Sequence, residues 1–106
     1  MKTRKQFRQG DVYLIEARIP KDAARKEING RAIMAYGEVT GHAHAIEQVQ
    51  DIEIYEKDGR TFVRVINRDG TPLTHEEHGA ITLPKGDFER VIQREYSPEA
   101  IRNVAD

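Results

Sequence analysis

The sequence contains no cysteine among its 106 residues. This absence excludes disulfide bonds, thiolate catalysis and cysteine-ligated zinc sites, so a transition-metal site would have to use imidazole and carboxylate ligands. No apolar run approaches the roughly 18 residues of a membrane span, and the first residues lack the apolar core of a signal peptide. We therefore expect a cytoplasmic protein that does not associate with membranes.

An excess of charge of one sign is also missing. The 17 lysines and arginines nearly balance the 18 aspartates and glutamates, and the formal net charge is -1 with histidine neutral. Such a chain has no overall field that attracts nucleic acid or an anionic membrane. With 38% hydrophobic and 33% charged residues, the composition is polar without being typical of a disordered chain. The length predicts a single domain.

Motifs of several common enzyme classes are absent as well. We find no glycine-rich phosphate loop, no serine nucleophile elbow and no dinucleotide-binding fingerprint. The segment His75-Glu76-Glu77-His78 resembles the zinc-peptidase pattern His-Glu-x-x-His only superficially, because it is one residue shorter. Gly79 and Pro84 also argue against a helix there. We do not expect a peptidase, and the sequence leaves open whether the protein is an enzyme at all.

The clearest positive feature is a set of four histidines in two close pairs, with none elsewhere. His42 and His44 are two residues apart, a spacing that puts both rings on one face of a strand. His75 and His78 are three residues apart, a spacing that shares one face across a tight turn. Imidazole is the commonest protein ligand for transition metals. We predict that these four residues bind a divalent transition metal, with zinc as the first expectation.

Three carboxylates are close enough in sequence to complete this site or to support its ligands: Glu47, Glu76 and Glu77. If the site is catalytic, one coordination position stays open for water, and a glutamate that is not a ligand could act as a general base. The alternative is that the histidines form a polar surface, a buried hydrogen-bonded cluster or a pH-sensitive patch.

Short strand-like runs alternate with turn signals along most of the chain, which predicts an all-β fold. Asp58-Gly59, between two such runs, is typical of a tight hairpin turn, and Asp69-Gly70 indicates another reversal. Segment 21–27, after Pro20, favours a loop. The architecture that fits is a small antiparallel β-barrel or sandwich. The expected strands cover residues 12–15, 31–36, 39–46, 52–56, 61–66, 81–83 and 88–94.

The two ends of the chain differ from this β-rich part. Residues 1–8 are locally basic and are expected to form an arm, and residues 9–96 form the single β-barrel domain. In the tail, Ser97 can cap a helix whose first position is Pro98 and whose first turn contains Glu99. We therefore predict a short C-terminal helix over residues 97–106.

Four segments together resemble a family of small, uncharacterised proteins of bacteria and their phages. These are Arg8–Val12, Ala35–His44, His75–His78 and Gln93–Glu99, and the resemblance extends from about Arg8 to Asp106. It gives weight to the histidine motifs, which are specific to that family, but it implies no reaction.

A weaker resemblance is to the cupin superfamily of small β-barrels. His42, His44, Glu47 and His78 match the metal ligands of cupins, and residues 81–86 resemble the cupin turn with the pattern apolar, Pro, x, Gly. Two departures put Glu47 in doubt and leave only an analogy of architecture. Glu47 follows His44 after two residues instead of three or four, and both later histidines precede the Pro-x-Gly turn.

Three functions are compatible with these observations. The first is a metal-binding protein in which the ion has a structural role or a role with a small-molecule ligand. The second is a metal-dependent enzyme, cupin-like or hydrolytic. The third is a phage-type nucleic-acid or protein interaction module that binds no metal. Arginines such as Arg60, Arg64 and Arg68 are interspersed with acids, so we expect a mixed outer face rather than a nucleic-acid surface. An exposed edge strand would also allow a homodimer.

Overall fold

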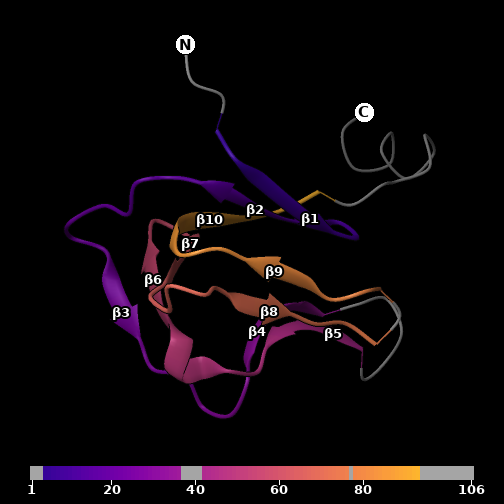
Figure 1. The fold of residues 1–106 in the computed structure, drawn as a ribbon. Helices are drawn as coiled ribbons and strands as arrows, with labels where there is room; N and C mark the ends of the chain where they lie inside the picture. The colour runs from indigo at the N-terminus through magenta and orange to yellow at the C-terminus, as the bar shows by residue number, and fades with distance from the viewer. Residues whose placement is uncertain (1–3, 37–41, 77, 94–106) are drawn as a thin grey trace, which may run out of the picture.

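A computed structural model describes residues 4–36, 42–76 and 78–93 of the chain (Figure 1). Strands make up the regular structure of these residues, apart from one 3-10 turn, η1 (Val49–Asp51). The strands are β1 (Gln6–Gln9), β2 (Val12–Glu16), β3 (Ala24–Lys26), β4 (Ala32–Tyr36), β5 (Ala43–Ile46), β6 (Ile52–Lys57), β7 (Arg60–Val65), β8 (Thr71–Leu73), β9 (Ile81–Leu83) and β10 (Gly86–Ile92). The all-β prediction is confirmed for the described part of the chain.

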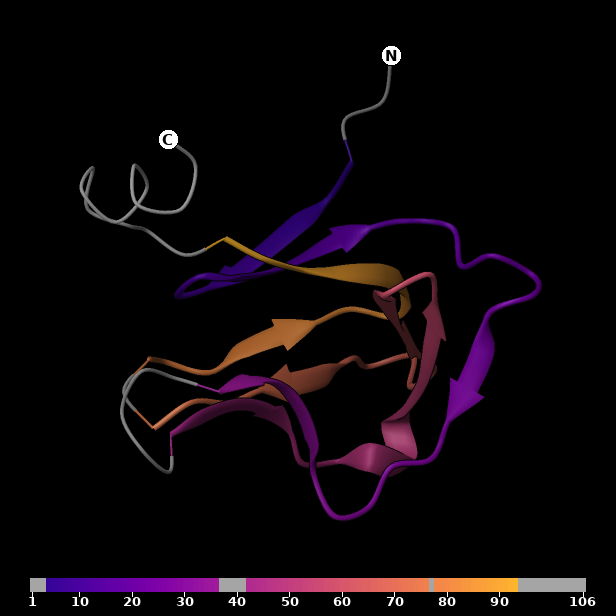
Figure 2. The ribbon, with the colours of Figure 1, turned by 180° about the vertical axis from the view of Figure 1, so that it is seen from behind.

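Six of the strands form one antiparallel sheet in the order β1-β2-β10-β7-β6-β3. Strands β4 and β5 form a second pair, and β8 and β9 a third. Ala45 of β5 and Thr74, just after β8, exchange both backbone hydrogen bonds, at 2.9 and 2.8 Å, and so join the two pairs side by side. Figures 1 and 2 show these four strands facing the curved main sheet. Because β1 and β3 remain as edges of the main sheet, the described chain has the layers of a sandwich.

The hydrophobic core lies between these layers. Strands of the main sheet alternate inward apolar and outward polar residues, which is the pattern of a sheet covered on one face. Both hairpins supply apolar residues to the same core. The core consists of Val12, Leu14, Ala32, Met34, Ala35, Ile46, Ile52, Ile54, Val63, Val65, Leu73, Leu83 and Phe88.

Both turns predicted from Asp-Gly pairs are confirmed. Between β6 and β7, Asp58 has φ 52° and Gly59 has φ 76°, so both central residues adopt the positive φ that a tight hairpin requires. At the second reversal, the Gly70 N–H donates to the Asn67 carbonyl at 2.9 Å, and Gly70 has φ 83°.

Three strands lie where the sequence did not predict them, and one of these is β8 (Thr71–Leu73), which follows the Asp69-Gly70 turn. Strand β1 begins at Gln6, inside the segment expected to be a basic arm, because Phe7 packs its ring edge against Phe88 at 5.7 Å between centroids. Strand β3 lies within segment 21–27, expected to be a loop. Its residues are all exposed and pair only along β6, so no apolar pattern marks it. The predicted helix at 97–106 lies outside the described residues.

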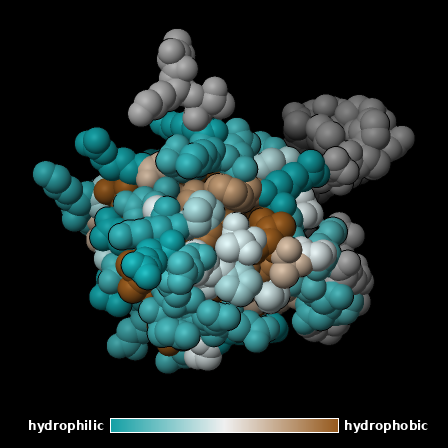
Figure 3. Space-filling view, in the orientation of Figure 1, coloured by the Kyte–Doolittle hydropathy of each residue, from teal (hydrophilic) through white to brown (hydrophobic). Residues whose placement is uncertain are grey.

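The outer face of the main sheet carries paired charges. Arg60 donates two hydrogen bonds to Glu89, at 2.9 and 2.8 Å, and Arg64 donates two to Asp87, at 3.0 and 3.2 Å. Over the face seen in Figure 3, hydrophobic residues are scattered among hydrophilic ones. These pairs agree with the mixed outer face predicted from the sequence. In the described ranges, no helix has the length and apolar character needed to cross a membrane.

Replacing Gly70 by alanine tests the packing of the β8–β9 pair. A Cβ at Gly70 would clash with the Leu83 carbonyl oxygen, whereas a Cβ at Gly59 would meet nothing within 4 Å. Both glycines have positive φ, so Gly59→Ala is the matched control for backbone strain. We expect urea unfolding to show a loss of roughly 1 kcal/mol for Gly59→Ala and roughly 2–4 kcal/mol for Gly70→Ala. Equal losses for the two variants would contradict the described packing.

Candidate metal centre

The four histidines lie at one end of the two layers. His42 immediately precedes β5 and His44 lies within it, while His75 and His78 belong to the segment that connects β8 to β9. Both views show this end of β5, the β8–β9 connection and the β1–β2 turn gathered on the same side of the molecule (Figures 1 and 2). The site therefore draws on three separate parts of the chain.

The structure brings all four predicted imidazole rings together. The centroid of the His44 ring lies 4.3 Å from that of His75 and 5.7 Å from that of His78. The rings of His75 and His78 are 4.7 Å apart. His42 joins this group through His75, at 5.8 Å and almost perpendicular to it. Two pairs separated by about thirty positions in the sequence thus form one cluster in the fold.

Burial is graded across the cluster. Only 2% of His44 is exposed, His42 and His75 are partly buried, and His78 is exposed. The cluster therefore runs from the interior of the protein to its surface. An ion bound here would have a rigid inner side and an accessible outer side.

Gln9, at the end of β1, determines which nitrogen of the neutral His44 ring carries the proton. The side-chain amide of Gln9 donates to the carbonyls of Leu73 and Gly79, each at 2.9 Å, which uses both of its N–H groups. Its Oε1 therefore faces His44 Nδ1, 2.8 Å away, and must accept a hydrogen bond from an N–H at that position. With the proton on Nδ1, Nε2 of the neutral ring keeps its lone pair. This is the state in which imidazole binds a metal, with its other nitrogen held by a polar group.

Glu76 positions the histidine segments relative to each other. Its Oε1 accepts a hydrogen bond from the Ala43 N–H at 2.9 Å, and this bond is the main cause that lowers the pKa of the Glu76 carboxyl. Its Oε2 lies 3.9 Å from Arg31 Nη1. Glu76 thus ties the β8–β9 connection to the start of β5. Of the other predicted carboxylates, Glu47 is exposed beyond the end of β5, and Glu77 lies outside the described residues.

The predicted turn at His75 and His78 has a hydrogen bond that closes it. The His78 backbone N–H donates to His75 Nδ1 at 3.4 Å, a long bond that spans the two histidines. This bond and the Glu76 contact together bring the rings of His75 and His78 to within 4.7 Å of each other.

The β1–β2 turn also contributes to the histidine cluster, which the sequence alone did not indicate. Gly10 has φ +60°, and a Cβ there would lie 2.9 Å from His78 Nε2 and 3.1 Å from His44 Cε1. The turn backbone therefore packs directly against the rings, which only glycine allows. The next residue, Asp11, has Oδ1 3.7 Å from His44 Nε2. Gln9 and Asp11 are more than thirty positions from His44 in the sequence, so no local spacing reveals them.

The histidine cluster has side chains of the kind that bind metal ions, but these side chains are not arranged around an ion position. Imidazole nitrogen and carboxylate oxygen suit zinc and other divalent first-row ions. As the side chains stand, however, the described residues contain no group of three or more His, Asp or Glu arranged to hold an ion. Binding an ion thus requires the rings to turn from their present packing. The exposed His78 has the most freedom to do so.

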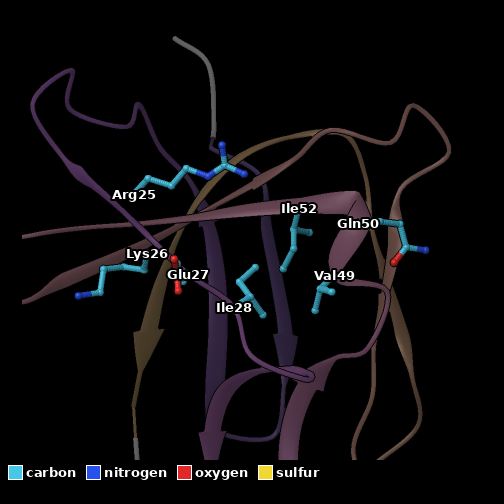
Figure 4. A pocket seen from close by; sticks show the side chains of 7 residues that line it. All are labelled: Arg25, Lys26, Glu27, Ile28, Val49, Gln50 and Ile52. Atoms are coloured by element: carbon cyan, nitrogen blue, oxygen red, sulfur yellow. The ribbon is translucent and has the colours of Figure 1, made fainter.

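A separate hollow of about 550 Å³ lies beside β3 and η1 (Figure 4). The side chains of Ile28, Val49 and Ile52 form its apolar part. No histidine lines it, so it is distinct from the histidine cluster. The lining residues are Arg25, Lys26, Glu27, Ile28, Val49, Gln50 and Ile52.

The Gln9–His44 bond predicts a specific tautomer. Nitrogen-15 spectra recorded at a pH where the His44 ring is neutral should show its proton on Nδ1. Gln9→Met should remove the preference for this tautomer. Because Gln9 is only 3% exposed and makes three hydrogen bonds, we expect this variant to lose roughly 2–4 kcal/mol of unfolding free energy. The exposed Gln50 offers the control variant Gln50→Met, with little expected loss. A His44 proton on Nε2 in the wild type would contradict the assignment.

Comparison with known proteins gives one family match. A family model described as "Domain of unknown function (DUF8820)" matches residues 8–93. No curated protein and no solved structure matches the chain. The matched region contains all four histidines together with Gln9, Gly10, Asp11 and Glu76. The chain therefore belongs to this family, the domain of unknown function DUF8820.

Proposed function

We propose that this protein binds zinc or another divalent first-row transition ion through His42, His44, His75 and His78. The observation that carries the proposal is the convergence of these four rings, with centroid separations of 4.3 to 5.8 Å along the cluster. The chain has no histidine outside this cluster. A random distribution of surface histidines would not place them all at one end of the fold.

The ring separations fit ligands of a common ion. With a metal–nitrogen bond of about 2.0 Å and about 1.1 Å from that nitrogen to the ring centre, two imidazoles on a tetrahedral ion have centroids about 5 Å apart. The observed separations, 4.3, 4.7, 5.7 and 5.8 Å, lie on both sides of this value. Neighbouring rings of the cluster are therefore close enough to bind a common ion after rotation of their side chains.

The support around His44 favours binding rather than a simple polar surface. His44 is buried, its tautomer is held by Gln9, and its Nε2 is the nitrogen 3.7 Å from Asp11 Oδ1. A buried imidazole whose other nitrogen is fixed by a hydrogen bond is typical of metal sites. The partly buried ring of His75 and the exposed ring of His78 can then adjust around the ion.

A structural role follows from where the ligands lie. An ion would join β5 to the β8–β9 connection, two segments held together at present by the Glu76 bond and by Ala45–Thr74 pairing. In a small domain without disulfides, such a link can contribute several kcal/mol of folding free energy. The exposed side at His78 favours a second candidate, a metal-dependent enzyme acting on a small molecule. There, one coordination position would remain open.

Titration of the metal-free protein with zinc tests the proposal. At free zinc one hundred times the dissociation constant, binding should stabilise the fold by about 2.7 kcal/mol, and raise its melting temperature by roughly 10 °C or more. Because His44 is the buried ligand, His44→Ala should abolish this rise, and His75→Ala should reduce it strongly. Tyr55→Ala, which removes a ring from the outer face, is the control and should keep the rise.

The outcome that contradicts the proposal is a wild-type melting temperature that does not respond to zinc, cobalt, nickel, manganese or ferrous iron. A rise that survives in His44→Ala would equally place the ion elsewhere. The size of the effect separates the two roles, since a structural ion gives a large loss of stability on chelation and a catalytic ion a small one.

A further inference from the structure

We propose that Asp11 is a carboxylate ligand of the same ion, so that the centre is a mixed imidazole and carboxylate site. This inference rests on the proposed metal binding and adds a residue from the β1–β2 turn, which no spacing of the histidines indicates. Asp11 Oδ1 lies 3.7 Å from His44 Nε2, and the Asp11 side chain is 21% exposed.

His44 Nε2 and the Asp11 carboxylate face each other. Gln9 holds the His44 proton on Nδ1, so the nitrogen nearest the Asp11 carboxylate carries a lone pair. A lone pair and a carboxylate oxygen repel unless a cation lies between them. That cation is either a second proton on the ring or a metal ion, and an ion is favoured by the neighbouring rings of His75 and His78.

The distance between His44 Nε2 and Asp11 Oδ1 is close to that between two ligands of one ion. Two donors bound to one ion at about 2.0–2.2 Å, at a tetrahedral angle, are separated by about 3.4 Å. The observed 3.7 Å from His44 Nε2 to Asp11 Oδ1 exceeds this by a few tenths of an ångström. A small rotation of the Asp11 side chain is enough to bring both donors onto one ion, while the buried His44 ring stays where Gln9 holds it.

A carboxylate ligand would also balance part of the charge of a divalent ion. Four neutral imidazoles leave both positive charges of a divalent ion uncompensated at a partly buried site, and one carboxylate ligand lowers that charge. Among the described carboxylates near the rings, Glu76 already accepts from the Ala43 N–H and faces Arg31. Asp11 Oδ1 lies 3.7 Å from a ring nitrogen of His44. Its carboxylate can therefore supply this negative charge.

The turn that carries Asp11 is held against the rings. The Gln93 N–H donates to the Asp11 carbonyl at 2.8 Å, and Arg8 Nε donates to the Gly10 carbonyl at 2.7 Å. Gly10 allows the close approach because it has no side chain. With Asp11 included, the ligands come from the β1–β2 turn, from β5 and from the β8–β9 connection. A nitrogen and oxygen set of this kind suits zinc, iron or manganese and disfavours cuprous copper.

The test compares Asp11→Asn with Asp58→Asn in zinc-binding measurements on the full chain. Asn keeps the size of Asp11 and removes its charge, and Asp58 is a matched control because it also lies next to a glycine with positive φ in a hairpin turn. We expect zinc affinity to fall at least roughly tenfold in Asp11→Asn and to stay at the wild-type value in Asp58→Asn. As a second measurement on the wild type, zinc should shift the carbon-13 carboxyl resonance of Asp11 and leave that of Asp58 unchanged.

The possible failures are distinguishable. If the wild type binds zinc and Asp11→Asn binds it equally well, Asp11 is not a ligand, and its carboxylate serves the protonated ring instead. If Asp11→Asn does not fold, an unshifted Asp11 carboxyl resonance in the zinc-bound wild type overturns the inference. If the wild type binds no zinc, iron or manganese, the proposed function fails and this inference with it.

Discussion

The amide of Gln9 is the interaction on which the site depends. A buried side-chain amide has to satisfy every polar group it carries, and Gln9 does so with three partners from different parts of the chain. Its two N–H groups hold Leu73 and Gly79, which flank the segment that contains His75 and His78. Its oxygen holds the His44 ring. One side chain thus fixes the distance between the histidine pairs and the tautomer of the buried one.

Fold and site are coupled through this end of the two layers. The β1–β2 turn can approach the rings because Gly10 has no Cβ, and that approach brings Gln9 and Asp11 to His44. Glu76 and the pairing of Ala45 with Thr74 hold β5 beside the β8–β9 connection. The contacts that complete the second layer are therefore also the contacts that gather the imidazoles. An ion bound there would stabilise the arrangement that creates its own site.

Local signals were sufficient for much of this arrangement. The Asp58-Gly59 and Asp69-Gly70 turns were predictable because backbone preferences of single residues decide them. The concentration of all four histidines in two close pairs suggested one cluster, and the pairing of Ala45 with Thr74 is what brings the two pairs together. Strand β3 was not predictable, since an exposed edge strand has no apolar alternation. Gln9 and Asp11 were missed because their roles arise only when the fold brings their side chains to His44, more than thirty residues away.

The metal content of the protein, purified without a histidine tag and without added metal, tests the central claim most directly. Elemental analysis should find a transition metal in nearly equimolar amount with the wild-type chain, and much less in a His44→Ala chain prepared in parallel. A wild-type protein that is fully folded and contains no transition metal, even after incubation with zinc, would contradict the account. The histidine cluster would then be a polar network organised by Gln9.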